Sequence, residues 1–208
     1  MTHGVHAVQH EVEHEIKHGD QHGGHGNLLD NINKKVALLI GVMALFLALS
    51  ETLGKSAQTA ALSYNVEASN LWAFFQAKNI RRTVLLTAAE EMTVNASGAP
   101  DAVKPAAMKQ IETWQKTAAR YRSEPEVGEG TEELAKRAKD VEKKRDTALA
   151  KYHHYEVASA AFQIGIVLAS ATVITGMVVL SFIAGGLGLI GLAFMAIGLF
   201  APHAVHLL

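Results

Sequence analysis

The chain has 208 residues, a formal net charge of −1 at pH 7 and no cysteine, and 49% of its residues are hydrophobic. The near-neutral charge leaves no extended basic surface, so nucleic acid is not expected as a partner. The absence of cysteine excludes disulfides, thiolate catalysis and cysteine zinc sites.

Residues 1–33 form a polar tail in which histidines recur every three or four residues. On a helix these histidines would form one stripe, opposite a second stripe of valine and isoleucine. Neutral imidazoles one turn apart can share a zinc, nickel or copper ion, so His10, His14 and His18 are candidate metal ligands. Two alternatives stay open, a pH-responsive or membrane-surface helix and a solvated tail that binds nothing.

Residues 34–54 are predicted to form the first transmembrane helix. The apolar run from Val36 to Leu53 reaches about 27 Å as a helix, close to the roughly 30 Å of a bilayer core. The preceding tail lacks the apolar core of a secretory signal, so this helix is expected to be an uncleaved anchor. Glu51, near its end, is a candidate functional residue, although it could also snorkel or pair with Lys55.

Residues 55–157 are predicted to form a water-facing helical domain between the first and second spans. Sixteen of the 19 Lys and Arg residues lie between Lys55 and Lys151. Three helices are predicted. Residues 58–94 contain no Pro or Gly and can continue the first span, ending at Ser97–Gly98, and apolar periodicity predicts a helix over 103–121 and another that Thr131 would cap. Their spacing favours an antiparallel bundle or a coiled-coil-like arrangement.

A short aromatic and histidine cluster, Tyr152–Glu156, marks the entry to the second span. Aromatic rings prefer the membrane interface, so the cluster is interpreted as an interfacial anchor. His153 and His154 point about 100° apart on a helix, so one metal ion cannot easily bind both. Gln163, one turn into the span, is a candidate for a hydrogen bond between helices.

The last 52 residues contain no Asp, Glu, Lys or Arg and have room for two spans, at residues 158–184 and 187–202, followed by a tail at 203–208. Gly185–Gly186 is predicted to supply the reversal between them, and Pro202 to end the last helix. Small residues would let these two helices pack closely as an antiparallel hairpin. They are Gly165, Ala169, Thr172, Gly188, Gly191 and Gly198.

The predicted fold class is therefore all-α, an integral membrane protein with three transmembrane helices and an inserted helical domain. Four stretches resemble a bacterial family of uncharacterised three-span membrane proteins, domain-of-unknown-function family 4337. They are LFLALSE at 45–51, WAFFQAKNIRRTVL at 72–85, RYRSEPEVGEG at 120–130 and YHHYEVASAAFQ at 152–163. The resemblance implies location and architecture, and it supplies no activity, cofactor or catalytic residue.

No phosphate loop, zinc-protease motif or nucleophile elbow is present, so no enzymatic activity is expected. The apolar residues around Trp72, Phe74 and Ile80 cover more of their helix than one face, which favours a structural or scaffolding protein that self-associates or joins a larger membrane complex. A channel or transporter-like oligomer is one alternative. A metal-binding or pH-sensing protein that acts through the tail is the other.

The expected location is the inner membrane of a bacterium, in contact with lipid. Lys and Arg within twenty residues of the spans are more numerous on the domain side than on the tail side. The positive-inside rule therefore places the helical domain in the cytoplasm and the histidine-rich tail in the periplasm.

Overall fold

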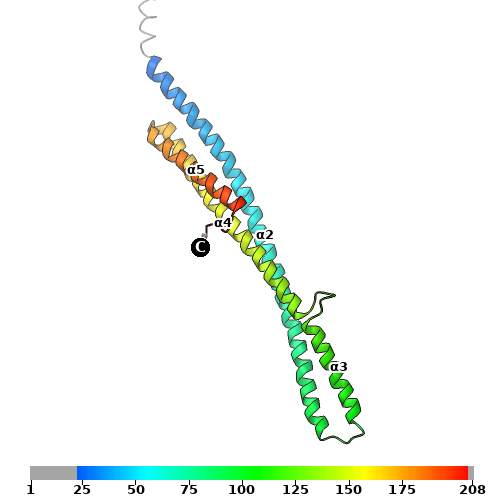
Figure 1. Cartoon of the computed structure of the whole chain (residues 1–208). Helices are drawn as coiled ribbons and strands as arrows, with labels where there is room; N and C mark the ends of the chain where they lie inside the picture. The colour runs from blue at the N-terminus through cyan, green and yellow to red at the C-terminus, as the bar shows by residue number, and fades with distance from the viewer. Residues whose placement is uncertain (1–22, 206–208) are drawn as a thin grey trace, which may run out of the picture. The chain divides into compact units, whose positions relative to one another are not determined.

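A computed structural model of the protein describes residues 23–205, with side chains from residue 32 onward. All regular structure within these residues is helical, in the order α2 (Gly23–Ser97), α3 (Lys104–Arg122), α4 (Thr131–Thr175) and α5 (Val178–Phe200) (Figure 1). The all-α prediction is confirmed. Three of these helices, α2, α4 and α5, are long and apolar enough to cross a membrane.

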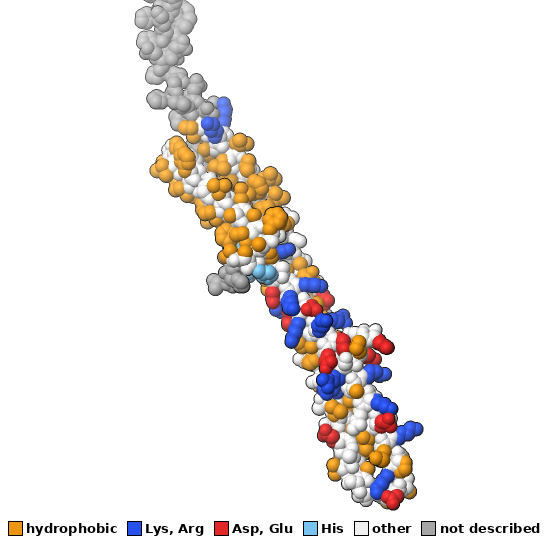
Figure 2. Space-filling model, viewed as in Figure 1, with side chains coloured by type: hydrophobic (Ala, Val, Ile, Leu, Met, Phe, Trp, Pro, Cys, Tyr) orange, Lys and Arg blue, Asp and Glu red, His pale blue; other side chains and the backbone are white. Residues whose placement is uncertain are grey.

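The chain divides into two compact units. The apolar unit combines the chain up to Gly54 with the chain from Tyr152 onward, and the charged unit is Lys55–Lys151. In Figure 2 hydrophobic side chains dominate the visible face of the apolar unit, whereas Lys, Arg, Asp and Glu side chains cover much of the charged unit. This division of side chains matches one part that meets lipid and another that meets water.

The apolar unit is held together by close packing of α2, α4 and α5. One cluster joins Val36 with Ala169 and Ala184, and a second joins Met43, Ala158 and Phe162. Without a hydrophobic driving force between helices in lipid, such contacts depend on small residues that let backbones approach.

The small residues expected to line the interface between the last two helices are buried, as predicted. A methyl group at Gly191 would lie 2.8 Å from the Phe162 ring, and one at Gly198 would lie 3.0 Å from both His154 and Tyr155. Gly188 instead faces Met43 of α2. Glycine is therefore needed at the contacts between α4 and α5.

The predicted reversal at Gly185–Gly186 is wrong, because both glycines lie inside α5. The chain turns at Gly176, whose φ of +71° is a conformation that glycine adopts easily. Its N–H donates a hydrogen bond of 2.9 Å to the Thr172 carbonyl and so caps the C-terminus of α4. The earlier turn gives α5 23 residues, about 35 Å of helix, instead of a segment too short to span a bilayer.

The charged unit is built from α2, α3 and the first part of α4. Its core cluster comes from α2 and α4 and consists of Ala68, Leu71, Leu134, Ala138 and Val141. Further along α2 the neighbour is α3, which runs beside it in Figure 1. Since α3 and α4 follow one another along α2, one side of α2 is covered within this unit, and no three-helix cross-section forms.

The covered side of α2 in the charged unit follows steps of three and four residues. The buried and half-buried positions that follow this repeat are Ala57, Ala61, Tyr64, Ala68, Leu71, Phe75, Lys78, Arg82, Leu85, Ala89, Met92 and Ala96, and Ala60, Trp72, Asn79, Leu86 and Ala88 are half-buried beside them. This repeat is typical of two helices that pack at a small angle. We call these positions the covered face of α2.

The segment between α3 and α4 is fixed by several side-chain hydrogen bonds. Thr131 donates from its hydroxyl to the Arg122 carbonyl at 3.2 Å, so the expectation that it caps α4 is wrong. Glu133 accepts from the Ser123 hydroxyl at 2.7 Å and from the Glu124 N–H at 3.3 Å. The carboxylate of the first turn of α4 thus holds the connecting segment in place.

Candidate functional site

The structure brings together two of the predicted polar residues of the apolar unit. The Gln163 side-chain amide on α4 donates to the Glu51 carboxylate on α2 at 3.2 Å, which bears out the expected hydrogen bond between helices. Both side chains are exposed at the protein surface. The carboxylate therefore stands on an otherwise apolar exterior with an amide as its neighbour, where contact with lipid alone would be unfavourable.

His154 is buried where α4 meets the end of α5. Its Nε2 lies 3.0 Å from the Pro202 carbonyl oxygen, and its ring stacks on Phe194 with centroids 6.1 Å apart. The Nδ1 atom is buried without a hydrogen-bond partner among the described residues. The contact with Pro202 ties the end of α5 to the start of the apolar stretch of α4.

His153 occupies a different environment from its neighbour. Its Nδ1 lies 3.7 Å from the Glu156 carboxylate, and its ring is tilted against that of Tyr152 at a centroid distance of 5.4 Å. Its side chain is half-exposed, whereas that of His154 is fully buried. The two histidines therefore do not form one site, as the helical spacing indicated.

The three candidate metal ligands of the tail, His10, His14 and His18, lie outside the described residues. Over the part of the chain whose side chains are described, no group of three or more His, Asp or Glu residues is placed to hold a metal ion. Metal binding by the histidine-rich tail therefore stays a prediction from the sequence.

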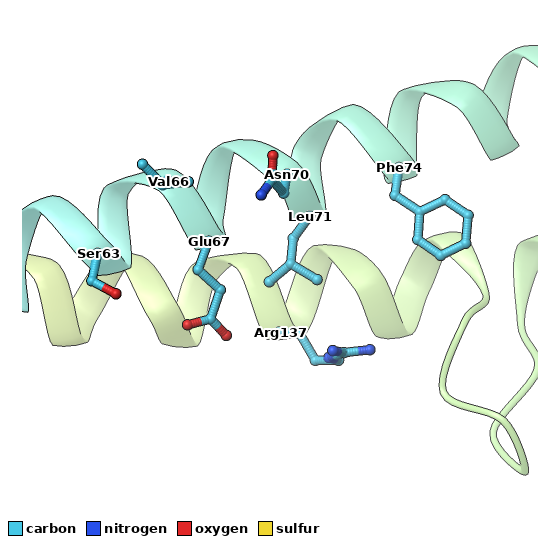
Figure 3. Close-up of a pocket in the computed structure, with 7 residues that line it drawn as sticks. All are labelled: Ser63, Val66, Glu67, Asn70, Leu71, Phe74 and Arg137. Carbon is cyan, nitrogen blue, oxygen red and sulfur yellow. The ribbon is translucent and has the colours of Figure 1, made fainter.

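An open groove of about 440 Å³ lies on the charged unit between α2 and α4. Figure 3 shows Glu67 and Leu71 of α2 pointing toward α4, and Arg137 of α4 at the opposite rim. Arg137 donates to the Gly128 carbonyl at 3.4 Å. The groove is lined by Ser63, Val66, Glu67, Asn70, Leu71, Phe74 and Arg137.

Lys78 is a buried cation that the sequence analysis did not single out. It is 7% exposed, its ammonium lies 3.6 Å from the carboxylates of both Glu124 and Glu129, and it stands over the rings of Phe74 and Tyr121. The sequence signal for its burial was its position: Leu71, Phe75 and Lys78 follow one another in steps of four and three residues, which places Lys78 on the covered face of α2. It joins α2 to α3 and to the segment that follows α3.

The carboxyl group of Glu133 is electrostatically tuned by this same segment. The hydrogen bond from the Ser123 hydroxyl, assisted by backbone N–H groups and the nearby Lys78 ammonium, lowers the pKa of Glu133 below its ordinary value of 4.5. Burial acts in the opposite direction and is the weaker effect. Glu133 is therefore ionised at neutral pH and serves a structural role.

Residues 32–201 match the family described as "Domain of unknown function (DUF4337)". The match covers most of the chain, which therefore belongs to this family, as the resemblance indicated. No curated protein and no solved structure matches the chain. The matched region includes α2 from residue 32 onward, all of α3, α4 and α5, the buried Lys78, and the pair formed by Glu51 and Gln163.

Proposed function

We propose that this protein is a membrane-spanning structural component that self-associates and thereby organises a larger membrane assembly. Three apolar helices anchor it, and its charged unit supplies the surface through which copies would meet. Membership of a family with an unknown function leaves this role open, and the apolar helices are compatible with it.

The observation that carries the proposal is the exposed apolar surface of the charged unit. Leu62, Val66, Ile80 and Val84 of α2 are each at least 60% exposed in the unit that carries most of the chain's Lys and Arg. Contact of such side chains with water is unfavourable, at about 25 cal/mol for each Å² left exposed. A run of them along one helix is typical of an interaction surface.

A channel is a weaker candidate, because the contacts among α2, α4 and α5 are mostly apolar, with Ser50, His154 and Thr172 as their buried polar side chains. The buried clusters of the apolar unit consist of Val36, Ala169 and Ala184, and of Met43, Ala158 and Phe162. A water path needs polar side chains or backbone carbonyls along its length. Neither the groove nor the buried histidine has the arrangement of an active site, so we expect no catalytic activity.

We further propose that the protein lies in a bacterial inner membrane with the charged unit in the cytoplasm and the histidine-rich tail in the periplasm. The excess of Lys and Arg on the side of the charged unit supports this orientation. Reporter fusions at Ala99 and at the C-terminus should agree with each other and differ from a fusion at Thr2. A reporter at Ala99 that is active only outside the cytoplasm would reverse the orientation.

Self-association is tested by the mass of the purified full-length protein in a mild detergent, measured by sedimentation over a wide range of protein concentration. The proposal predicts a mass of at least two chains that falls only on strong dilution. A single chain at every concentration would rule it out.

A further inference from the structure

The way in which Glu51 and Gln163 meet turns a carboxylate toward the interior of the membrane. Gln163 follows Phe162, which packs with Met43, so Gln163 lies nearer the middle of the first span than Glu51 does. Long side chains on a helix lean toward its N-terminus. Because α2 and α4 are antiparallel in the apolar unit, the two side chains lean toward each other and meet at 3.2 Å. The Glu51 carboxylate is therefore held inward of its own backbone instead of extending toward water.

The surface around this pair changes from polar to apolar along α4. Neighbours of Gln163 on the same side of the helix lie within an arc of about 80° at about 100° per residue. Toward the start of the span they are Ser159 and Glu156, and Glu156 is exposed. Toward its centre the next neighbour is Val167, which is 66% exposed. The pair thus lies where a polar surface gives way to an apolar one, as a phospholipid does between its head group and its acyl chains.

We infer that Glu51 and Gln163 form a binding site for the primary ammonium head group of a phospholipid, with Glu51 as its counter-ion. Among the described residues, the Gln163 amide is the one hydrogen-bonding or ionic partner of Glu51. A carboxylate in contact with lipid is costly unless a cation accompanies it. Since lipid covers this surface, charge complementarity requires a lipid that brings the cation with it.

The free acceptors of the pair select the kind of head group. The amide bonds to Oε1 of Glu51, so Oε2 of Glu51 and the side-chain carbonyl of Gln163 are the atoms that can accept from a ligand. A primary ammonium offers both a positive charge and N–H donors, and charge-assisted hydrogen bonds are the stronger ones. A quaternary ammonium cannot donate, and an anionic head group is repelled. Phosphatidylethanolamine has the chemistry that this site requires.

The pair lies within reach of lipid head groups. The apolar run that begins at Val36 ends at Leu53, two residues beyond Glu51 and about 3 Å further along the helix. A bilayer thins locally around a charged side chain, so a head group can descend by such a distance at modest cost. Inward of the pair, Ala44 on α2 and Val167 on α4 are exposed and apolar, and they offer a surface to the acyl chains.

Other cations fit the pair less well. A metal ion needs several oxygen ligands, whereas the pair supplies one carboxylate and one amide. Over the residues whose side chains are described, no group of three or more His, Asp or Glu is placed to hold a metal ion. A proton on Glu51 would remove its charge, and the protein would then show no preference among lipid head groups. The preference itself therefore distinguishes a bound ammonium from a bound proton.

The test is the binding of single lipids to the full-length protein in detergent, measured by native mass spectrometry with lipids of identical acyl chains. We expect phosphatidylethanolamine to bind about tenfold more tightly than phosphatidylglycerol, and its affinity to fall with each methyl group added to the nitrogen, as far as phosphatidylcholine. Free ethanolamine at the same concentration should leave the lipid bound, because it lacks acyl chains. Equal affinity for the three head groups would overturn the inference, as would displacement by free ethanolamine.

Variants locate the preference at the pair. Glu51→Gln preserves the shape of the side chain but removes its charge, so it should abolish the preference for phosphatidylethanolamine. Glu91→Gln, at an exposed position of α2 in the charged unit, makes the same change of charge and should keep it. Gln163→Leu should weaken the preference, since the carboxylate loses the amide that holds it inward. Helicity by circular dichroism confirms folding of each variant. A preference that survives Glu51→Gln would overturn the inference. Lipid binding is read from the mass of a single chain, so the result is independent of self-association.

Discussion

The hydroxyl of Ser50 donates a hydrogen bond of 2.9 Å to the backbone carbonyl of Tyr155, 105 residues further along the chain. Ser50 is completely buried, and Tyr155 is 3% exposed. The bond joins α2 to α4 near the point where α4 enters its apolar stretch. It is the kind of polar contact between helices that stabilises membrane bundles in the absence of a hydrophobic driving force.

Ser50→Ala should destabilise the apolar unit by about 0.5–1.5 kcal/mol, because it removes this bond without changing the helix backbone. Thr52→Ala is the matched control, since the Thr52 hydroxyl bonds only to Ala48 within its own helix and is exposed. Unfolding in a denaturing detergent, followed by loss of helicity, measures both. Equal effects would show that the bond to Tyr155 contributes nothing.

Gly191→Ala should destabilise the contact between α4 and α5 by about 1–3 kcal/mol, because its methyl group would lie 2.8 Å from the Phe162 ring. Gly186→Ala on the same helix has nothing within 4 Å of its methyl group, so it should be neutral or slightly stabilising. The same detergent unfolding assay compares them. A neutral Gly191→Ala would contradict the close packing described here.

Lys78→Met should destabilise the charged unit by about 1–2 kcal/mol. The side chain keeps its approximate length, but Glu124 and Glu129 lose their shared cation; their own partial exposure limits the penalty. Lys116→Met, which removes a cation that is 75% exposed and paired within one helix, should cost less than about 0.5 kcal/mol. Thermal unfolding of the full-length variants distinguishes these values.

Glu133 should make the charged unit sensitive to acid. Its pKa is lower in the folded protein than in the unfolded chain, so its stabilising effect is complete above the unfolded pKa of 4.5 and is lost as the pH falls through the folded pKa. Glu133→Gln should therefore lower the melting temperature at pH 7 and flatten its decline below pH 5. Glu126→Gln, on the exposed part of the same segment, should keep the wild-type profile.

The sequence was sufficient to predict the helices, because each is long and strongly periodic or strongly apolar. The expected ends at Ser97 and at Tyr121 lie at or beside the observed ones, and the break before Thr131 is where α4 begins. The sequence also predicted that Gln163 forms a hydrogen bond between helices, but not that Glu51 is its partner, because the approach of α2 to α4 at this point depends on tertiary packing.

The turn between α4 and α5 could not be placed from composition alone. Gly176 and the pair Gly185–Gly186 are equally plausible breakers in an uncharged run, and helix length decides between them. The burial of Lys78 depends on α3 and on the segment after it, which are distant in sequence. Whether α3 and α4 flank α2 together or follow one another along it is likewise a property of tertiary packing.

Self-association through the exposed apolar residues of α2 is tested most directly by energy transfer between copies of the chain in lipid vesicles. The copies are labelled with donor or acceptor at Ala119→Cys, on the exposed side of α3, and are reconstituted together. As lipid is added at constant protein, we expect transfer that stays above the level of random proximity for the otherwise wild-type chain and falls to that level when Ile80→Glu is added. Transfer that follows random proximity for both chains at every dilution would contradict it.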